Sequence, residues 1–503
     1  MATTIRAAPT AALQHLSNRS LSALSPRIGR PAYDRSAVLP GIVHLGLGAF
    51  CRAHLAVYTD DVLASGARDW GIVGVDLMSP AIRVALKPQD CLYSVFSRQA
   101  GGDQLRVIGS LLDALIVPEQ LDQVLTLMVD PRIKIVTLTV TEKGYCQDAA
   151  TSALDETNQA IVADLANPAA PRTAPGLLSE AIRLRRAAGV APFTVLVCDN
   201  LLQNGATARR IVIRFAELRD KDLGKYIAEN ISFPCTMVDR ITPATQDEDR
   251  AAIASGFGVE DAWPVVCEPF RQWVIEDRFP LGRPQWEEAG ALLVDDVHPF
   301  ELMKLRCLNG AHSTLAYLSV IAGIESIAEA MSNPQFSAVI HRLWAEDLVH
   351  TLPPVPGTDV SLYTQALEER FLNPGVHHRT LQVSADGSQK LPPRLLEPAL
   401  ARLQAGARPR TIALAVAAWM RFVVGVNERN IAYEIADPLA PRLRKIGQDC
   451  AHSAERLAAE LFGITEIFSP DLVGNGNFRQ DVKRYLNSLM TKGVQRTLAD
   501  FLA

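Results

Sequence analysis

The pattern of apolar residues changes once along this chain, and that change constrains the fold more than any other feature. Up to about residue 280, short strand-like apolar runs alternate with helical stretches, at 41–66, 71–77, 133–140, 177–189 and 193–200. Strands that alternate with helices indicate parallel pairing in a doubly wound α/β sheet. After the Pro- and Gly-bearing stretch 279–290 the pattern is almost wholly helical. We therefore predict an α/β protein with an N-terminal Rossmann-like domain and a mainly α-helical C-terminal domain.

The length of 503 residues exceeds what one hydrophobic core usually organises, which favours two large domains. We place an N-terminal arm at 1–38, a Rossmann-like dinucleotide-binding domain at 39–294, and a helical substrate domain at 295–503. Residues 1–33 contain arginines but no Asp or Glu, as organellar targeting segments do. They have no apolar core typical of a secretory signal, and an ordinary arm is favoured over a targeting segment.

The composition argues against several classes of partner. The net charge is −5 and the basic residues are dispersed, whereas nucleic-acid and anionic-membrane binders usually show a basic face. The longest strongly apolar run, 412–426, is too short to span a bilayer and contains Arg421, so it predicts a buried helix. The eight cysteines are scattered, without CxxC or zinc-type spacing. We expect reduced thiols, a cytoplasmic location, no metal, and a small molecule as the partner.

The segment 41–66 predicts a strand, a glycine turn and a helix. Gly46 and Gly48 permit a tight turn and let a pyrophosphate approach the following helix. The third glycine of the full dinucleotide fingerprint is missing, since Cys51 stands in its place. A lone GxG also suits a plain strand-to-helix turn, but its place after the first strand favours dinucleotide binding.

The acidic residue that contacts the ribose of the dinucleotide should end the second strand. Asp76 is the carboxylate available there. A carboxylate at this position accepts a ribose hydroxyl and repels a 2'-phosphate, so Asp76 would favour NAD over NADP. Its side chain could equally face the sheet, and NADP is not excluded.

Lys304, Asn309 and His312 open the helical half. In a regular α-helix they span an arc of roughly 140°, so all three could face one cleft. Oxidation of an alcohol needs a base for the hydroxyl proton and donors that hold the developing alkoxide. Each residue alone also has an ordinary structural explanation, as a surface lysine, a turn former or a core histidine.

Polar residues also stand where two strands of the first half should end. Asp199 and Asn200 follow the strand at 193–200, and Asp239 follows an apolar run at 235–238. The carboxyl ends of strands line the ligand crevice in open α/β sheets, although these residues could simply cap the next element.

Together these motifs resemble the mannitol dehydrogenase family, the polyol-specific long-chain dehydrogenases. The resemblance runs from about residue 30 to about 500, and it is carried by the following segments: GIVHLGLGAFCRAHLAVYTDD, TLTVTEKGYC, VCDNLLQNG, PCTMVDRITPAT, CEPFRQWVIEDRF, MKLRCLNGAHSTLAYL and FLNPGVHHRTLQVSADGSQKLP. It implies a NAD-binding Rossmann domain with a helical domain, and substrate in the cleft between them. We expect a monomer or weak oligomer.

The resemblance also implies roles for single residues. Lys304 falls on the general base, and Asn309 and His312 on groups that position substrate and stabilise the oxyanion. Asn200 and Asp239 fall on substrate-site positions, and Glu301 on a carboxylate that assists proton exit. The cofactor turn falls on consecutive residues and one nearby arginine: Gly46, Leu47, Gly48, Ala49, Phe50 and Arg52. The family usually has Phe-His-Arg after the glycines, whereas this chain has Phe50-Cys51-Arg52, which puts only local phosphate-side contacts in doubt.

The substrate is left open between a sugar acid (D-mannonate and fructuronate) and a neutral polyol (D-mannitol and D-fructose). The segments TEKGYC, EPFRQW and HHRTLQVSADGSQKLP resemble fructuronate reductases more than mannitol 2-dehydrogenases. A substrate carboxylate needs a cation, and Arg271 is the first candidate, supported by Arg379 and Lys390. Alternatively, Arg271 pairs with Glu276 or Asp277. A catalytically silent NAD-binding regulator is the remote alternative, disfavoured because Lys304, Asn309 and His312 occur together.

Overall fold

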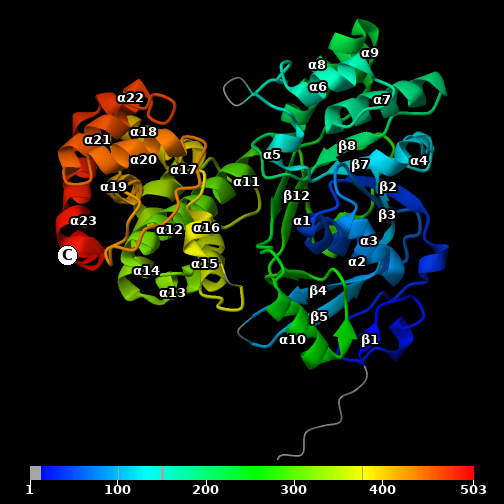
Figure 1. The fold of residues 1–503 in the computed structure, drawn as a ribbon, viewed down its shortest axis with the longest axis horizontal. Coiled ribbons are helices and arrows are strands. Elements are labelled where there is room, and N and C mark those ends of the chain that lie inside the picture. The colour runs from blue at the N-terminus through cyan, green and yellow to red at the C-terminus, as the bar shows by residue number, and fades with distance from the viewer. Residues whose placement is uncertain (1–12, 100, 149–151, 377) are drawn as a thin grey trace, which may run out of the picture. The chain divides into compact units, whose positions relative to one another are not determined.

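The computed structural model describes residues 13–99, 101–148, 152–376 and 378–503. The chain forms two compact units, Met1–Val297 and His298–Ala503. In Figure 1 the first runs from blue to green and the second from green to red. We call them the Rossmann unit and the helical unit, and describe each by itself. Among the described residues, no helix is both long and apolar enough to cross a membrane.

The Rossmann unit is built on a five-stranded, wholly parallel sheet in the order β6-β3-β2-β7-β8. Its strands are β2 (Pro40–Leu45), β3 (Gly71–Asp76), β6 (Leu111–Ile116), β7 (Ile135–Leu138) and β8 (Thr194–Val197). The first strand lies in the middle and the order reverses beside it, between β2 and β7. This confirms the doubly wound α/β prediction, and ligands bind such sheets at that reversal.

Both faces of this sheet are covered, which explains why its strands are continuous apolar runs. Val43 and Leu45 pack with helices α4 (Val117–Val129), α7 (Ala174–Ala187), α8 (Asn204–Arg219) and α9 (Lys221–Asn230). Ile42 faces the other way, toward α2 (Leu55–Ala64) and the buried Trp273 and Trp286. Neighbouring residues of one strand therefore serve two different cores.

Two three-stranded sheets belong to the same unit. One has the order β13-β12-β9, with β9 (Thr236–Asp239) antiparallel to β12 (Gln272–Glu276) and β13 (Leu292–Val294) parallel to β12. The other has the order β11-β4-β5, from Val265–Cys267, Tyr93–Ser97 and Gln104–Ile108. The further helices of this unit are α1 (Ala49–Ala53), α3 (Ala81–Leu86), α5 (Thr141–Gly144), α6 (Gln159–Ala166) and α10 (Asp247–Phe257).

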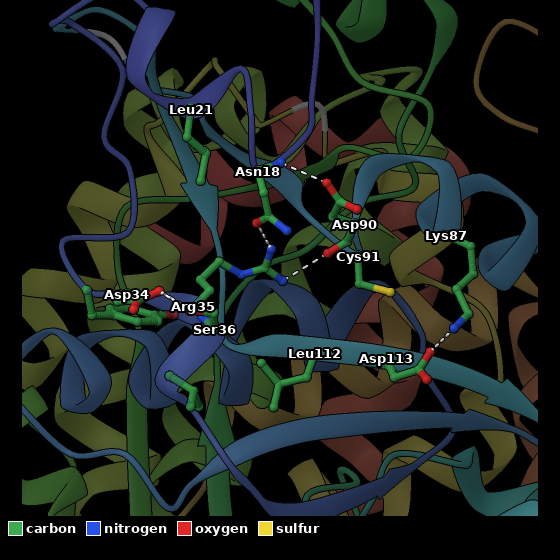
Figure 2. A pocket seen from close by; sticks show the side chains of 12 residues that line it. Asn18, Leu21, Asp34, Arg35, Ser36, Lys87, Asp90, Cys91, Leu112 and Asp113 are labelled. Atoms are coloured by element: carbon green, nitrogen blue, oxygen red, sulfur yellow. Dashed lines mark hydrogen bonds and ion pairs between the residues drawn. The ribbon is translucent and has the colours of Figure 1, made fainter.

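The described part of the N-terminal arm, 13–38, packs on the Rossmann unit. Its strand β1 (Gln14–His15) pairs in parallel with β10 (Val259–Glu260), and Leu16, Leu24 and Ile28 are buried against the β4/β5 sheet. A cavity of about 640 Å³ lies beside the arm. In Figure 2, Arg35 reaches Asn18 and the Asp90 carbonyl, and Lys87 reaches Asp113. None of the predicted site residues lines this cavity.

The helical unit is all-helical, as the change in apolar pattern predicts. Its α-helices are α11 (His298–Met303), α12 (Ala311–Ala322), α13 (Ile327–Ser332), α14 (Pro334–Arg342), α15 (Val360–Phe371), α16 (Thr380–Val383), α17 (Gly387–Leu391), α18 (Glu397–Gln404), α19 (Arg410–Phe422), α20 (Ala440–Asp449), α21 (Ala454–Phe462), α22 (Pro470–Gly474) and α23 (Gly476–Leu502). The apolar run at 412–426 forms the buried α19, which packs on α12 and α23. Arg421 of that run donates to the Val426 carbonyl at 2.9 Å.

Three π-helical segments interrupt the α-helices of this unit: η5 (Lys304–Gly310), η6 (Leu343–Leu348) and η8 (Pro392–Leu396). The π-helix is rare, and short π segments are frequent at functional sites. Segment η5 contacts both of the others. The three irregular segments therefore form one neighbourhood within the helical unit.

Candidate active site

The glycine turn follows β2 at the reversal of the strand order. Gly46 has a φ of +88°, and a Cβ there would lie 2.3 Å from the Thr139 carbonyl oxygen at the end of β7. Only glycine fits that position without strain. A Cβ on Gly48 would meet nothing closer than the Gly46 carbonyl oxygen, at 3.7 Å, so the backbone there is open to an approaching group. The turn fits a dinucleotide held by backbone groups.

His44 holds this turn in place from inside the sheet. Its Nε2 lies 3.1 Å from the Gly46 carbonyl oxygen, and its Nδ1 lies 2.8 Å from the Thr137 hydroxyl. Its Nε2 also lies 2.9 Å from the Thr139 hydroxyl. Thr139 also donates to the Gly46 carbonyl, at 2.9 Å. Burial lowers the pKa of His44 to about 4, so the ring stays neutral. The apolar pattern predicted the strand but not this clamp.

Most side chains within and just after the glycine turn point into the protein. Leu47 is buried in the core, and Phe50 stacks on His54 with ring centroids 4.9 Å apart. Arg52 is also buried, and its guanidinium donates to the Gly48 carbonyl at 3.2 Å and lies over the Tyr93 ring. Arg52 thus braces the turn through Gly48. The helix predicted here breaks at His54, whose backbone is not helical.

Asp76 is the last residue of β3, where the ribose contact is expected. One oxygen of its half-buried carboxylate accepts the backbone N–H groups of Met78 and Ser79, each at 2.9 Å. The side chain is therefore fixed at the carboxyl end of the strand and does not point into the sheet. This placement suits a ribose hydroxyl contact.

The predicted strand-end residues do end strands, but in two different sheets. Asn200 is exposed after β8 in the parallel sheet, whereas Asp239 is the buried last residue of β9 in the β13-β12-β9 sheet. Asp199, beside Asn200, accepts the backbone N–H groups of Val140 and Thr141 at 3.0 and 2.9 Å. Asp199 therefore shapes the loop after β7, and Asn200 is the residue that points outward.

In the helical unit, the regular helix assumed for Lys304, Asn309 and His312 is wrong. Lys304 and Asn309 lie on the π-helix η5, and His312 lies on α12. In a π-helix, residues five apart are joined by a backbone hydrogen bond and lie almost above one another along the axis. The angle between Lys304 and Asn309 about the helix axis is therefore smaller than the roughly 140° of a regular α-helix. All three side chains are buried. Glu301 is buried one turn earlier, with its carboxylate 3.7 Å from His298 Nδ1.

The neighbouring π segments stabilise η5 through its backbone carbonyls. Trp344 of η6 donates its indole N–H to the Cys307 carbonyl at 2.8 Å. Arg394 of η8 donates to the Asn309 carbonyl at 3.4 Å and to the Ser313 hydroxyl at 3.1 Å. These bonds tie η5 to the two neighbouring π segments.

His312 is packed between aromatic rings. The ring centroids of Phe371 and His378 lie 4.4 and 4.8 Å from its own, and the His378 ring is perpendicular to it. Its buried Nε2 has no hydrogen-bond partner among the described residues. Burial, with His378, Arg370, Arg394 and Lys304 nearby, lowers the pKa of His312 well below its usual value. The ring is neutral at pH 7, and a buried polar atom in this state is suited to bind a ligand.

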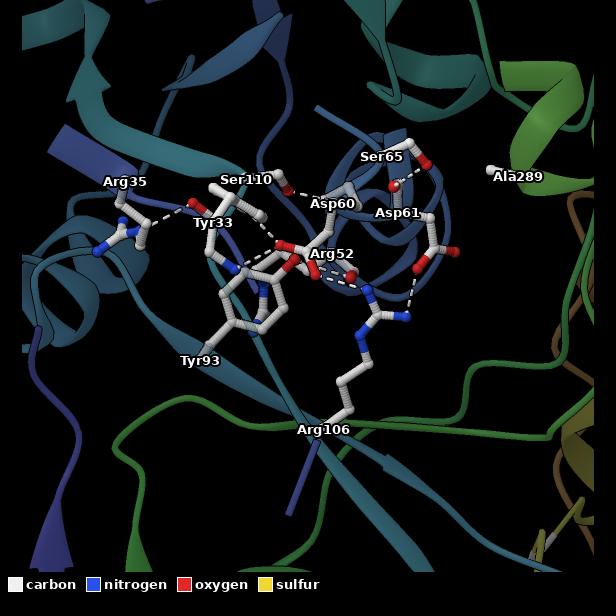
Figure 3. Close-up of polar contacts among 12 residues, drawn as sticks. Tyr33, Arg35, Arg52, Asp60, Asp61, Ser65, Tyr93, Arg106, Ser110 and Ala289 are labelled. Carbon is white, nitrogen blue, oxygen red and sulfur yellow. Dashed lines mark hydrogen bonds and ion pairs between the residues drawn. The ribbon is translucent and has the colours of Figure 1, made fainter. Parts of the chain in front are cut away.

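Two of the three cations predicted for a substrate carboxylate have acidic partners. Arg271 donates to Asp61 at 2.6 Å and lies over the Tyr58 ring at 4.3 Å, so its ion-pair partner is neither Glu276 nor Asp277. Asp61 also pairs with Arg106, which binds the buried Asp60 (Figure 3). Lys390 lies 3.4 Å from Asp386, and Arg379 is exposed.

Several contributors could not be found from apolar pattern or motif: His44, Thr139, Trp344 and Arg394. Each acts through a contact with a distant part of the chain, and only the glycine turn near His44 gave any signal. The eight cysteines are free thiols. Among the described residues, no three His, Cys, Asp or Glu side chains are grouped in a way that could hold a metal ion.

Comparison with known proteins identifies the family that this fold and these residues define. Residues 40–288 match the mannitol dehydrogenase Rossmann domain, and residues 296–490 match the mannitol dehydrogenase C-terminal domain. The chain belongs to the mannitol dehydrogenase family and is a dehydrogenase acting on a CH–OH group.

Its relatives differ in substrate. The chain is 46% identical over 477 residues to D-mannonate oxidoreductase of Escherichia coli K12, covering 94% of this chain and 98% of the relative. It is 41% identical to mannitol 2-dehydrogenase of Cereibacter sphaeroides, covering 95% of this chain and 99% of that one. Mannitol 2-dehydrogenase of Pseudomonas fluorescens, solved in a ternary complex with NAD and D-mannitol, superposes with a TM-score of 0.87 at 37% identity, covering 97% and 99% of the two chains.

Proposed function

We propose that this NAD-dependent dehydrogenase interconverts D-mannonate and D-fructuronate, and that Lys304 is its general base. The observation that carries the proposal is the buried set of Lys304, Asn309 and His312 on η5 and α12. A base and two hydrogen-bond donors on one helical segment are what alcohol oxidation requires. The similarity to D-mannonate oxidoreductase supports the choice of a sugar acid.

In the direction of oxidation, neutral Lys304 accepts the proton of the substrate hydroxyl. The Asn309 amide and the neutral His312 ring donate hydrogen bonds to the alkoxide as its charge develops. NAD, when bound, supplies the hydride acceptor, so a secondary alcohol becomes a ketone. Glu301, one turn before Lys304, then takes the proton onward toward solvent. Asn200 and Asp239 bind substrate hydroxyls.

The proposed NAD-binding residues all lie in the Rossmann unit. The backbone of Gly46 to Phe50 holds the pyrophosphate, braced by His44 and Arg52. Asp76 accepts the ribose hydroxyl and disfavours the 2'-phosphate of NADP. We also propose a monomer or weak oligomer, tested by gel filtration, and a cytoplasmic location, which the eight free thiols support.

The second candidate is mannitol 2-dehydrogenase, favoured by the similarity to the Cereibacter and Pseudomonas enzymes. A four-way absorbance assay separates the two: purified protein with NADH or NADPH, and D-fructuronate or D-fructose. We expect the highest kcat/KM with NADH and D-fructuronate. A preference for D-fructose would make the second candidate correct, and a protein that binds NADH but reduces neither would support the silent regulator.

A further inference from the structure

Arg394 is a partly desolvated cation of the helical unit. It is half-buried on η8, and it makes no ion pair with any residue that the structure describes. Burial lowers its pKa to about 10, so the guanidinium is still charged at pH 7. A partly desolvated cation without an anion is costly, and a bound anion would relieve that cost.

The contacts of Arg394 place it at the proposed catalytic residues. Its Nη1 donates to the Asn309 carbonyl and to the Ser313 hydroxyl. Asn309 is a proposed catalytic residue, and Ser313 follows His312 directly in the chain. A guanidinium has five N–H donors in a planar fork. Both neutral acceptors are bound by the same nitrogen, Nη1. No acidic group among the described residues uses the remaining donors.

The second cation, Arg370, is half-buried at the end of α15, which packs against η5. Its charge contributes to the lowered pKa values of both His312 and His378. His378 is held in place by its backbone, because its carbonyl accepts the Ile327 N–H at 3.0 Å and its N–H donates to the Val376 carbonyl at 2.7 Å. His312, whose Nε2 has no partner among the described residues, therefore lies against the His378 ring, and the charges of both arginines act on it.

The contrast with Arg271 decides where an anion would bind. Arg271 already has the carboxylate of Asp61 at 2.6 Å, and Lys390 has Asp386 at 3.4 Å. A second carboxylate would have to compete with these acidic side chains. Arg394 makes no ion pair with a described carboxylate, and it contacts the proposed catalytic helix directly.

We propose that Arg394 and Arg370 form the subsite that receives the carboxylate of the sugar-acid substrate, beside His312, whose N–H serves the alkoxide. This assignment rests on the proposed function, since it names the part of the same site that would distinguish a sugar acid from a neutral polyol. Arg394 contributes a charge-assisted, forked hydrogen bond, and Arg370 adds positive charge near His312.

The test compares kcat/KM for D-fructuronate and D-fructose with NADH in four variants. Arg394→Met should reduce kcat/KM for D-fructuronate by roughly ten- to a hundredfold more than for D-fructose, the usual loss of a hydrogen bond to a charged group, while any loss of support for η5 affects both substrates alike. Arg394→Lys should recover part of the loss, and Arg370→Met should show a smaller loss of the same selectivity. Arg410→Met, which removes an exposed arginine at the start of α19, should affect neither substrate.

NADH binding and thermal unfolding establish that each variant is folded. If Arg394→Met does not fold, Arg394→Lys and Arg370→Met carry the test. Equal losses on both substrates in these variants, with the wild-type enzyme active on D-fructuronate, would overturn the subsite and leave the proposed function intact. A wild-type enzyme that reduces D-fructose but not D-fructuronate would overturn the proposed substrate, and the subsite with it.

Discussion

The Rossmann unit and the helical unit build their predicted sites by different means. The predicted site of the Rossmann unit, the glycine turn, depends on backbone conformation. Gly46 requires a positive φ, and His44 and Thr139 hold its carbonyl. The predicted site of the helical unit consists of side chains on an irregular helix. Trp344 and Arg394 from two other π segments stabilise that helix. We therefore expect the proposed backbone site to tolerate changes in side-chain identity, such as Cys51, and the proposed helical site to depend on exact residues.

The largest expected effect is a loss of catalysis in the helical unit without a change in NADH binding by the Rossmann unit. Lys304→Ala removes the proposed base, so kcat should fall by about 10²- to 10⁴-fold, the usual contribution of general acid–base catalysis. NADH affinity should stay unchanged, because the proposed cofactor residues lie in the Rossmann unit. Steady-state kinetics and a fluorescence titration with NADH measure the two quantities.

Two control variants sharpen this experiment. Lys304→Arg keeps the positive charge but cannot lose a proton, so it should be as inactive as Lys304→Ala. Lys445→Ala, which removes an exposed lysine on α20, should retain full activity. An active Lys304→Ala or Lys304→Arg enzyme would remove Lys304 from the mechanism.

The reverse experiment perturbs the Rossmann unit with a matched pair of glycines. Gly46→Ala should lose about 1–3 kcal/mol of folding stability, because its φ of +88° is strained for alanine and its Cβ would lie 2.3 Å from the Thr139 carbonyl oxygen. Gly48→Ala has room for its Cβ, so its stability should hold while NADH affinity falls, since the methyl group stands where the pyrophosphate approaches. Urea unfolding and NADH titration distinguish the two. Unchanged NADH affinity in Gly48→Ala would place the pyrophosphate elsewhere.

The same contrast explains what could be predicted from the sequence. The doubly wound sheet, the glycine turn and the buried helix at α19 follow from local patterns of apolar residues and glycine, and the structure confirms this fold. The arc assumed for Lys304 and Asn309 was wrong because no local signal marks a π-helix. Segment η5 is supported by Trp344 and Arg394, which are 37 and 85 residues away from the carbonyls they bind. Nor did local patterns reveal β4, β5 and β11, which build the sheet beside the N-terminal arm.

The dependence of folding stability on pH should also have separate contributions from the two units. Burial lowers the pKa of His378 to about 4, against the 6.5 of an exposed histidine, so between these values the unfolded chain binds a proton that the folded helical unit does not. Stability should therefore fall as the pH decreases from about 6.5 to about 4. His378→Phe keeps an aromatic ring and removes this titration, so its urea midpoint should depend less on pH across this range. His44, whose pKa is also lowered to about 4, leaves the Rossmann unit acid-sensitive in that variant. A pH dependence identical to that of the wild type would mean that His378 does not titrate in this way.

The smallest expected effect concerns Arg271, the cation of the Rossmann unit first predicted to meet a substrate carboxylate. Its guanidinium pairs with Asp61 and covers the Tyr58 ring, and Asp61 keeps Arg106 as a second partner if Arg271 is removed. Arg271→Leu should therefore cost only about 1 kcal/mol of folding stability, near the upper end for a solvent-accessible ion pair, and change kcat/KM for D-fructuronate and D-fructose equally. Chemical denaturation and the two-substrate assay measure both quantities. A selective loss on D-fructuronate would show that Arg271 binds the carboxylate after all. Carboxylate recognition would then belong to the Rossmann unit, and the assignment to Arg394 and Arg370 would be wrong.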